Sequence, residues 1–315
     1  MLRFLLRLLD QATASRATLR RAALATLAAN IGIVVTGGLV RLTGSGLGCP
    51  TWPRCTDESY VTTSAMGFHG VIEFGNRTLT FVIGFIAAVG VLAAWRQRHR
   101  VPGVFGGAVW VMIGIGLQGV VGGITVHLAL NPWIVAVHFL LSMVLIAVAY
   151  LFWYRTREVP PQWTAPRAVR TGGWLIAAMT AVVLVLGTIV TGSGPHSGDT
   201  RATRTGFDPA AVSQLHGDAV FVLLGLSVAM WLAVRGLGAP LRVTRAAGVL
   251  ILVELSQGVV GFVQYFTGLP WPVVVLHMLG ACLAWTSSLS VLVSLAPLSG
   301  KRPVTEPSAV DVRVG

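Results

Sequence analysis

Four of the seven histidines recur at matched places in long apolar stretches. His138 and His277 each lie twenty residues after the start of a copy of the block Gln-Gly-Val-Val-Gly, and the two copies are 139 residues apart. His69 and His216 each precede a glycine near the start of another pair of apolar stretches. Ionisable side chains are costly inside a bilayer and usually face a bundle interior, and neutral imidazole is a strong axial ligand of haem iron. The pattern predicts two iron sites, His69 with His138 and His216 with His277.

A second interpretation of these histidines stays open. They could be packing residues whose rings hydrogen-bond to backbone groups between helices. Placement of all four at one depth favours the ligand interpretation, because packing alone does not require a duplicated position. Zinc is less favoured, since no cysteine or carboxylate cluster shares that depth.

A carboxylate and a guanidinium follow the first of these histidines. Glu73 and Arg77 are four residues apart, so on a helix they lie on one face and can pair. Glu73 is also four residues after His69. The other half of the chain has Ala219 and Val220 near the matching place. An ion pair inside a membrane can be structural, but its presence in one half only favours a role in proton transfer.

The elements that must position these residues are membrane helices. The chain has 315 residues, of which 54% are hydrophobic and 11% charged. Such a composition indicates an integral membrane protein, and spanning takes about 20 apolar residues per helix. Eight runs meet that length, which predicts an all-α protein with eight transmembrane helices. The expected ranges are 21–40, 67–94, 103–123, 132–153, 172–191, 210–234, 243–266 and 271–296.

The distribution of the net charge of +12 along the chain indicates how the helices are oriented in the membrane. Of the 23 basic residues, 18 precede the first run, follow the last, or lie between runs 2 and 3, 4 and 5, or 6 and 7. That is the positive-inside pattern, so both termini are expected in the cytoplasm and no nucleic-acid partner is expected. The use of 22 Arg and one Lys suggests a bacterium with a GC-rich genome.

The matched landmarks divide the chain into two four-helix halves that form a parallel repeat. The expected halves are 21–154, with the substrate site, and 172–297, with the cofactor site. A basic arm (1–20) on the cytoplasmic membrane face, a proline-rich linker (155–171) and a disordered tail (298–315) complete the division.

Two cysteines lie in the first outer loop. Cys49 and Cys55 enclose Pro-Thr-Trp-Pro-Arg, and a disulfide can persist there in an oxidising compartment. Such a bond would close a short ring, so its entropic stabilisation would be modest. Two roles are open: a clip that shapes the loop, or a device that positions or gates the loop over the first bundle.

Together these features resemble the haem A synthase family over roughly residues 21–296. The resemblance rests on GGLVRLTGSGLGCPTWPRC after the first helix, IEFGNR in the second, the cysteine pair and the later histidines. It implies oxidation of the C8 methyl group of haem O to a formyl group, which gives haem A for terminal oxidases. It also implies a disulfide between Cys49 and Cys55 and an essential glutamate at Glu73.

The resemblance assigns different haems to the two halves. It implies a haem b cofactor between His216 and His277, and a haem O substrate beside His138 and the second helix. Arg77 and Arg41 are candidates to contact haem propionates, while Arg41 is alternatively an interfacial anchor.

One position departs from the family. Its usual Glu-x-x-His-Arg pattern reads Glu73-Phe74-Gly75-Asn76-Arg77 here, and asparagine is not an ordinary haem ligand. We expect His69, seven residues earlier, to supply the missing imidazole.

Two other classes of protein are alternatives: a di-haem electron-transfer subunit and a transporter built from repeats. The Glu73–Arg77 pair in one half argues against two equivalent haems, and polar residues near the outer boundary argue against a midplane transport site. Expected partners are haem O and membrane lipid. Further candidates are the enzyme that produces haem O, the terminal oxidase assembly, and a second copy of the chain. The expected location is the bacterial cell membrane.

Overall fold

The computed structural model describes residues 15–157 and 163–295. Within these residues the protein is helical, with eight long helices and one short 3-10 turn, η1 (Ser64–Met66). The helices are α2 (Arg16–Leu42), α3 (Gly67–Gln97), α4 (Val104–His127), α5 (Pro132–Arg155), α6 (Arg167–Ser193), α7 (Pro209–Gly236), α8 (Leu241–Phe266) and α9 (Trp271–Leu295).

Local chemistry sets several helix starts. Ser15 caps α2 by accepting a hydrogen bond from the Thr18 amide, and Asn131 caps α5 through the Trp133 amide. Asp208 caps α7 in the same way. Proline follows the cap at the first position of α5 and α7, where its missing N–H is not needed.

All eight expected helices are present, and most of them extend a few residues beyond the apolar run at one end or both. The largest shifts are at the starts of α2 and α6, which begin at Arg16 and Arg167. The last residues of the expected basic arm (1–20) and of the expected linker (155–171) therefore belong to these helices. The first fourteen residues of that arm, the centre of the linker and the tail from 298 lie outside the described residues.

The side chains on the outer surfaces of the helices indicate which environment surrounds the protein. Each of the eight helices is long and apolar enough to cross a membrane. Large apolar side chains point outward, with Phe81 80% exposed, Phe85 71%, Leu252 67% and Trp110 66%. Soluble proteins rarely expose contiguous apolar surface of this kind. The chain is therefore a multi-pass membrane protein.

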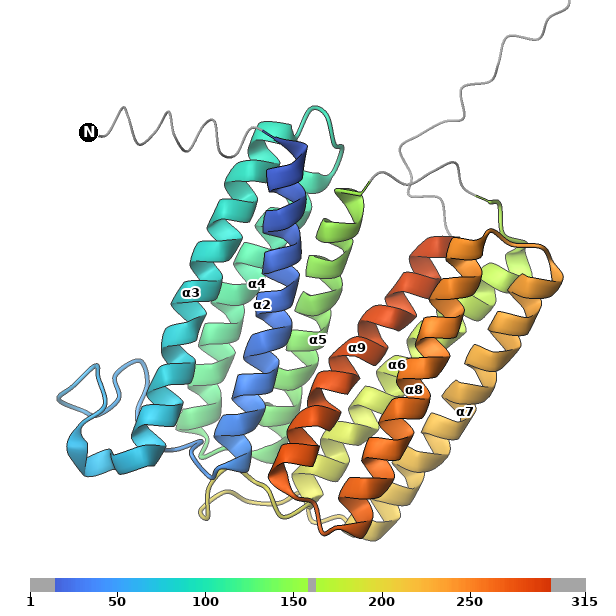
Figure 1. The fold of residues 1–315 in the computed structure, drawn as a ribbon. Coiled ribbons are helices and arrows are strands. Elements are labelled where there is room, and N and C mark those ends of the chain that lie inside the picture. The colour runs from blue at the N-terminus through green and yellow to red at the C-terminus, as the bar shows by residue number, and fades with distance from the viewer. Residues whose placement is uncertain (1–14, 158–162, 296–315) are drawn as a thin grey trace, which may run out of the picture.

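The helices pack as two groups of four, α2–α5 and α6–α9, which lie side by side in Figure 1. In each group neighbours in sequence pack together and the first helix packs on the last, so α3 lies diagonally across from α5 and α7 from α9. The seam between groups is made by α5 and α9, by α2 against α9 and by α5 against α6. The start of α2 and the end of α9 lie at the same end of the molecule (Figure 1).

The two groups bury the same helix faces. On α4 and α8 the buried residues Val104, Ala108, Val111 and Ile115 each lie 139 positions before Val243, Ala247, Leu250 and Glu254. On α3 and α7 the shift is 140, which matches Ile83, Ala87, Gly90 and Ala94 to Leu223, Ser227, Met230 and Val234. This register allows positions of the two groups to be compared without reference to residue type.

Candidate functional site

A cavity of about 1600 Å³ lies between the helices, toward the end that carries loops 43–63 and 194–208. All eight long helices contribute to its lining. A pocket for one small ligand usually holds about 300–1,000 Å³, so this cavity has room for more than one such ligand.

Three of the four predicted iron ligands line the cavity: His138, His216 and His277. The Nδ1 atoms of all three are buried, and those of His138 and His277 have no hydrogen-bond partner among the described residues. His216 on α7 and His277 on α9 lie on diagonally opposed helices of the second group. That is the arrangement in which two imidazoles can hold one planar group from opposite faces.

A glycine on a neighbouring helix lies against each of these rings. A Cβ atom on Gly122 would lie 3.6 Å from Cε1 of His138, and a Cβ on Gly261 would lie 3.7 Å from Cε1 of His277. A Cβ on Gly187 would lie 3.3 Å from Cε1 of His216. Larger side chains at these positions would fill the space beside the imidazoles. The donors and the clearance therefore fit a haem held by histidine.

The fourth predicted ligand lies elsewhere. His69 is exposed, is absent from the cavity lining, and its Nδ1 atom is 2.9 Å from the Ser45 hydroxyl. The structure therefore does not bring His69 together with His138. The match of His69 with His216 by residue type is also corrected, because the buried faces of α3 and α7 align His216 with Asn76.

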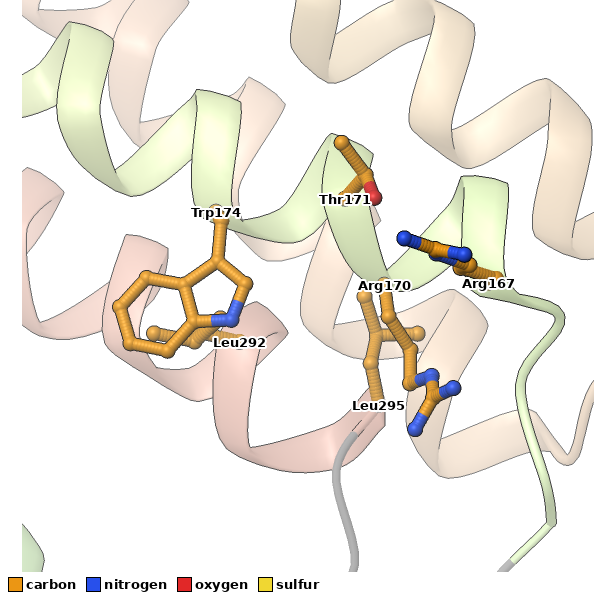
Figure 2. Close-up of a pocket in the computed structure, with 6 residues that line it drawn as sticks. All are labelled: Arg167, Arg170, Thr171, Trp174, Leu292 and Leu295. Carbon is orange, nitrogen blue, oxygen red and sulfur yellow. The ribbon is translucent and has the colours of Figure 1, made fainter.

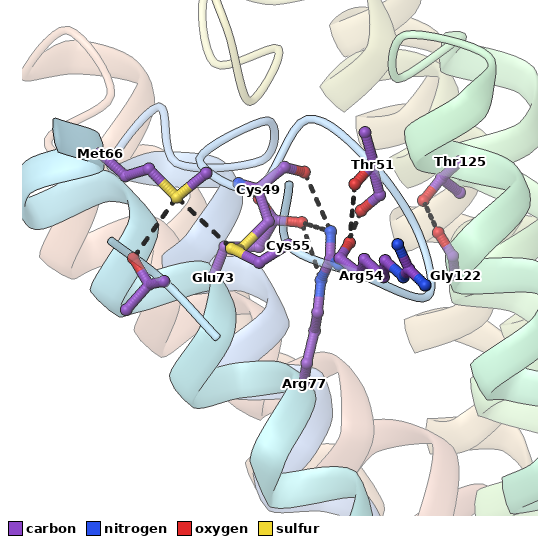
Figure 3. A network of polar contacts seen from close by, with 10 residues as sticks. Cys49, Thr51, Arg54, Cys55, Met66, Glu73, Arg77, Gly122 and Thr125 are labelled. Atoms are coloured by element: carbon purple, nitrogen blue, oxygen red, sulfur yellow. Dashed lines mark hydrogen bonds and ion pairs between the residues drawn. A yellow bond between two sulfur atoms is a disulfide. The ribbon is translucent and has the colours of Figure 1, made fainter. Parts of the chain in front are cut away.

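Glu73 and Arg77 form a clamp with the cysteine loop, shown in Figure 3. Arg77 donates to Glu73 Oε1 through Nη2 and, at 3.2 Å, through Nε. The other carboxylate oxygen, Oε2, accepts the Cys49 amide at 2.6 Å. Arg77 also donates to the carbonyl oxygens of Cys49 at 3.0 Å and Thr51 at 2.8 Å. Both oxygens of this buried carboxylate are thus occupied, and the pair borders the cavity.

The predicted disulfide between Cys49 and Cys55 is present. It closes the loop that supplies the amide and carbonyl groups of the clamp. From the same loop, Trp52 lines the cavity and its ring packs directly on Gly123 of α4. The ring contact and the clamp hold the loop over the first helix group.

The second group lacks this clamp. In the register of buried faces, Glu73 and Arg77 match Ser213 and Gly217, which replaces the expected match to Ala219 and Val220. The two halves of the cavity therefore differ in the charged side chains at these matched positions.

Arg41 bridges the two groups. Its Nε donates to the His196 carbonyl at 2.6 Å and its Nη2 to the Thr191 carbonyl at 2.9 Å. His196 in turn pairs through Nε2 with the Leu269 carbonyl at 3.0 Å. Arg41 also lines the cavity, so it contacts the other half's backbone and remains beside the space where a ligand would lie.

The loop after α6 carries one charged pair of its own. Arg201 donates to Asp199 Oδ1 at 2.9 Å, and this hydrogen bond holds the pKa of Asp199 below its ordinary range. The pair lies outside the helices.

Several lining residues were not singled out from the sequence. Asn30 on α2, Thr80 on α3 and Asp218 on α7 are polar examples. Asn30 lies within an apolar run, and a polar residue in such a run is the signal that would have marked it.

A smaller pocket of about 260 Å³, whose lining residues are drawn in Figure 2, lies at the opposite end of the molecule, where α6 begins and α9 ends. It is lined by Arg167, Arg170, Thr171, Trp174, Leu292 and Leu295. Arginine beside tryptophan is typical of a membrane–water boundary. These six lining residues include no imidazole, thiol or carboxylate, so the pocket is not a candidate for the chemistry considered above.

The fold and the cavity define a multi-pass membrane protein with histidines directed into the space between its helices. Residues 20–196, more than half of the chain, match the model of the family COX15-CtaA, described as "Cytochrome oxidase assembly protein". The chain belongs to this family.

Three curated relatives of this chain share the name "Heme A synthase". The "Heme A synthase" of Geobacillus kaustophilus is 30% identical over 131 residues, 41% of this chain and 40% of that protein. The "Heme A synthase" of Bradyrhizobium sp. (strain ORS 278) is 27% identical over 321 residues, 84% of this chain and 88% of that protein. The one from Jannaschia sp. (strain CCS1) is 24% identical over 79% of this chain and 80% of its own length. The chain thus spans about two fifths of the Geobacillus relative and most of the other two.

Proposed function

We propose that this protein oxidises the C8 methyl group of haem O to a formyl group and so produces haem A. The observation that carries the proposal is one cavity that joins a two-histidine site in the second group to a one-histidine site beside Glu73 and Arg77 in the first. Family membership and the names of the relatives support the same activity. The activity requires an enzyme that supplies haem O and a terminal oxidase that uses haem A.

In this proposal the two halves hold different haems. His216 and His277 hold a resident haem b, and His138 receives haem O. The resident haem, when bound, supplies electron transfer between the substrate and an external acceptor. The matching glycines Gly122 and Gly261 leave clearance beside the imidazoles of both halves.

The chain's own contribution to the chemistry is proton handling and positioning. Conversion of a methyl group and one water to a formyl group releases four protons and four electrons. Glu73 is a buried carboxylate of the first group that borders the cavity, so it is the proposed proton acceptor. Arg77 and the Cys49 amide hold both of its oxygens in place at the edge of the cavity. Arg77 and Arg41 are proposed to meet the haem propionates.

The proposed location is the bacterial cell membrane, with both termini in the cytoplasm and a tandem repeat of four helices. The excess of arginine at the helix ends opposite the cysteine loop supports this orientation. The matching buried faces of the two groups support the repeat.

The proposal is tested by extracting pigments from the purified protein after co-expression with a source of haem O. Haem b together with haem A, or with a hydroxylated intermediate, is the expected result. Two equivalents of haem b with no haem O product would instead indicate a di-haem electron-transfer protein. The clamp in one half argues against that alternative.

A further inference from the structure

The two halves of the cavity differ in how many imidazoles they direct inward. On α3, Asn76 occupies the position that His216 occupies on α7, according to four buried positions that match at a shift of 140. Asn76 lines the cavity, and α3 lies diagonally across from α5, which carries His138. Asn76 and His138 in the first group therefore correspond to His216 and His277 in the second.

The helix beside this position also differs between the two groups. The buried residues Ala22, Ala23 and Thr26 of α2 lie 154 positions before Ile176, Ala177 and Thr180 of α6. In this register Gly187, which leaves clearance for the His216 ring, corresponds to Ile33. The second group has His216 beside Gly187. At the matched positions, the first group has the shorter amide of Asn76 and the bulky apolar side chain of Ile33. The first group thus lacks both the second imidazole and the glycine that leaves clearance beside it.

The Asn76 amide is oriented by a hydrogen bond. The Thr36 hydroxyl donates to Asn76 Oδ1 at 2.7 Å, which is shorter than its 3.2 Å distance to the Ile33 carbonyl. The acceptor end of the amide is therefore used, and its Nδ2 end remains to donate. Among residues 15–157 and 163–295, no partner for Nδ2 is found.

We propose that the first site binds its haem through His138 alone and that Asn76 Nδ2 donates a hydrogen bond to a small ligand at the opposite face of the iron. The ligand class is a diatomic or a water-derived oxygen species. Hydrogen-bond donors and steric access on the open side of a haem decide whether small ligands bind there. This inference rests on the proposed function, since it takes haem O as the occupant of the first site.

The test uses the full-length protein loaded with both haems, read by electron paramagnetic resonance and by carbon monoxide difference spectra. The wild type is expected to show one low-spin haem and one high-spin haem, with carbon monoxide bound to the high-spin haem only. Asn76→His should convert the second signal to low spin and abolish carbon monoxide binding. His69→Ala should leave both spectra unchanged. Two low-spin haems in the wild type, with a carbon monoxide-binding haem appearing only in His69→Ala, would overturn the proposal.

The donor role of Asn76 is tested with cyanide. Asn76→Leu retains the open position but removes the N–H group, so the dissociation constant of cyanide should rise about tenfold, the effect of losing one hydrogen bond to a charged acceptor. An unchanged constant would contradict the donor assignment. The reciprocal variant His216→Asn should make the resident haem high-spin and reactive with carbon monoxide, and a persistently low-spin haem there would refute the matched register.

These readouts separate the inference from the proposed activity. Spin state and ligand binding are measured on bound haem and need no turnover. A protein that binds haem O with one open position but yields no haem A would contradict the activity alone. A protein that yields haem A with two low-spin haems would contradict this inference alone.

Discussion

At the scale of single residues, Glu73 combines a structural and a chemical role that substitutions can separate. Its oxygens are bound by Arg77 and by the Cys49 amide, so it holds the loop in place while it borders the cavity. Breaking a buried ion pair by removing one partner costs about 3–5 kcal/mol, because the remaining charge is left without compensation.

Glu73→Gln is expected to lower the rate of haem A formation by a factor of about 10²–10⁴, the usual contribution of a general base. Glu73→Gln and Arg77→Gln should each lower the thermal unfolding midpoint, whereas the double variant should regain much of that loss. Activity should stay low in the double variant, because no carboxylate has been restored. Recovery of activity together with stability would mean that the pair is only structural.

At the scale of helices, substitution of the glycines beside the histidines should prevent haem binding in one half of the cavity at a time. Gly122→Leu would place a side chain beside His138, and Gly261→Leu would do so beside His277. The first variant is expected to lose haem O while retaining haem b, and the second to lose haem b. Pigment content per protein measures both. Gly116→Leu is the control, since Gly116 is exposed and a Cβ atom there would have no neighbouring atom within 4 Å.

The disulfide loop is a second element with a defined effect. Because the bond between Cys49 and Cys55 closes a short loop, its removal in Cys55→Ser should cost about 2 kcal/mol of stability. The larger effect should fall on activity, because the loop supplies the Cys49 amide to Glu73. Dithiothreitol should reproduce the loss in the wild type and have no further effect in the variant. An equally active reduced protein would show that the loop needs no disulfide to hold Glu73.

The helices themselves were predictable, because about 20 consecutive apolar residues leave few alternatives to a membrane helix. The pair Glu73 and Arg77 was predictable from its spacing on one helix face. The placement of His69 was not. Loops 43–63 and 194–208 differ in length, so aligning the His-Gly pairs by residue type gave the wrong register between α3 and α7. Only the buried faces, which depend on packing, aligned Asn76 with His216.

At the scale of the whole molecule, Arg41 ties one helix group to the loop of the other. Arg41→Gln removes two hydrogen bonds from a charged donor and is expected to lower the free energy of unfolding by about 2 kcal/mol. Denaturation of the purified protein in detergent measures this change. Arg204→Gln is the matched control, because Arg204 is bonded within its own loop to the Pro195 carbonyl. A loss of haem from Arg41→Gln with unchanged stability would instead assign Arg41 to the propionates alone.

The seam between the groups is built from positions that match one another. Tyr154 of α5 lies with its hydroxyl 3.5 Å from the carbonyl of Val293 on α9, and these two residues are 139 positions apart, the same shift that relates α4 to α8. Contacts between one position and its own matched position are typical of an isologous homodimer interface, in which both subunits use the same surface. In a homodimer, however, any substitution appears in both subunits at once. Joining the two halves in one chain removes that restriction, so one half can keep His216 while the other carries Asn76 and Glu73.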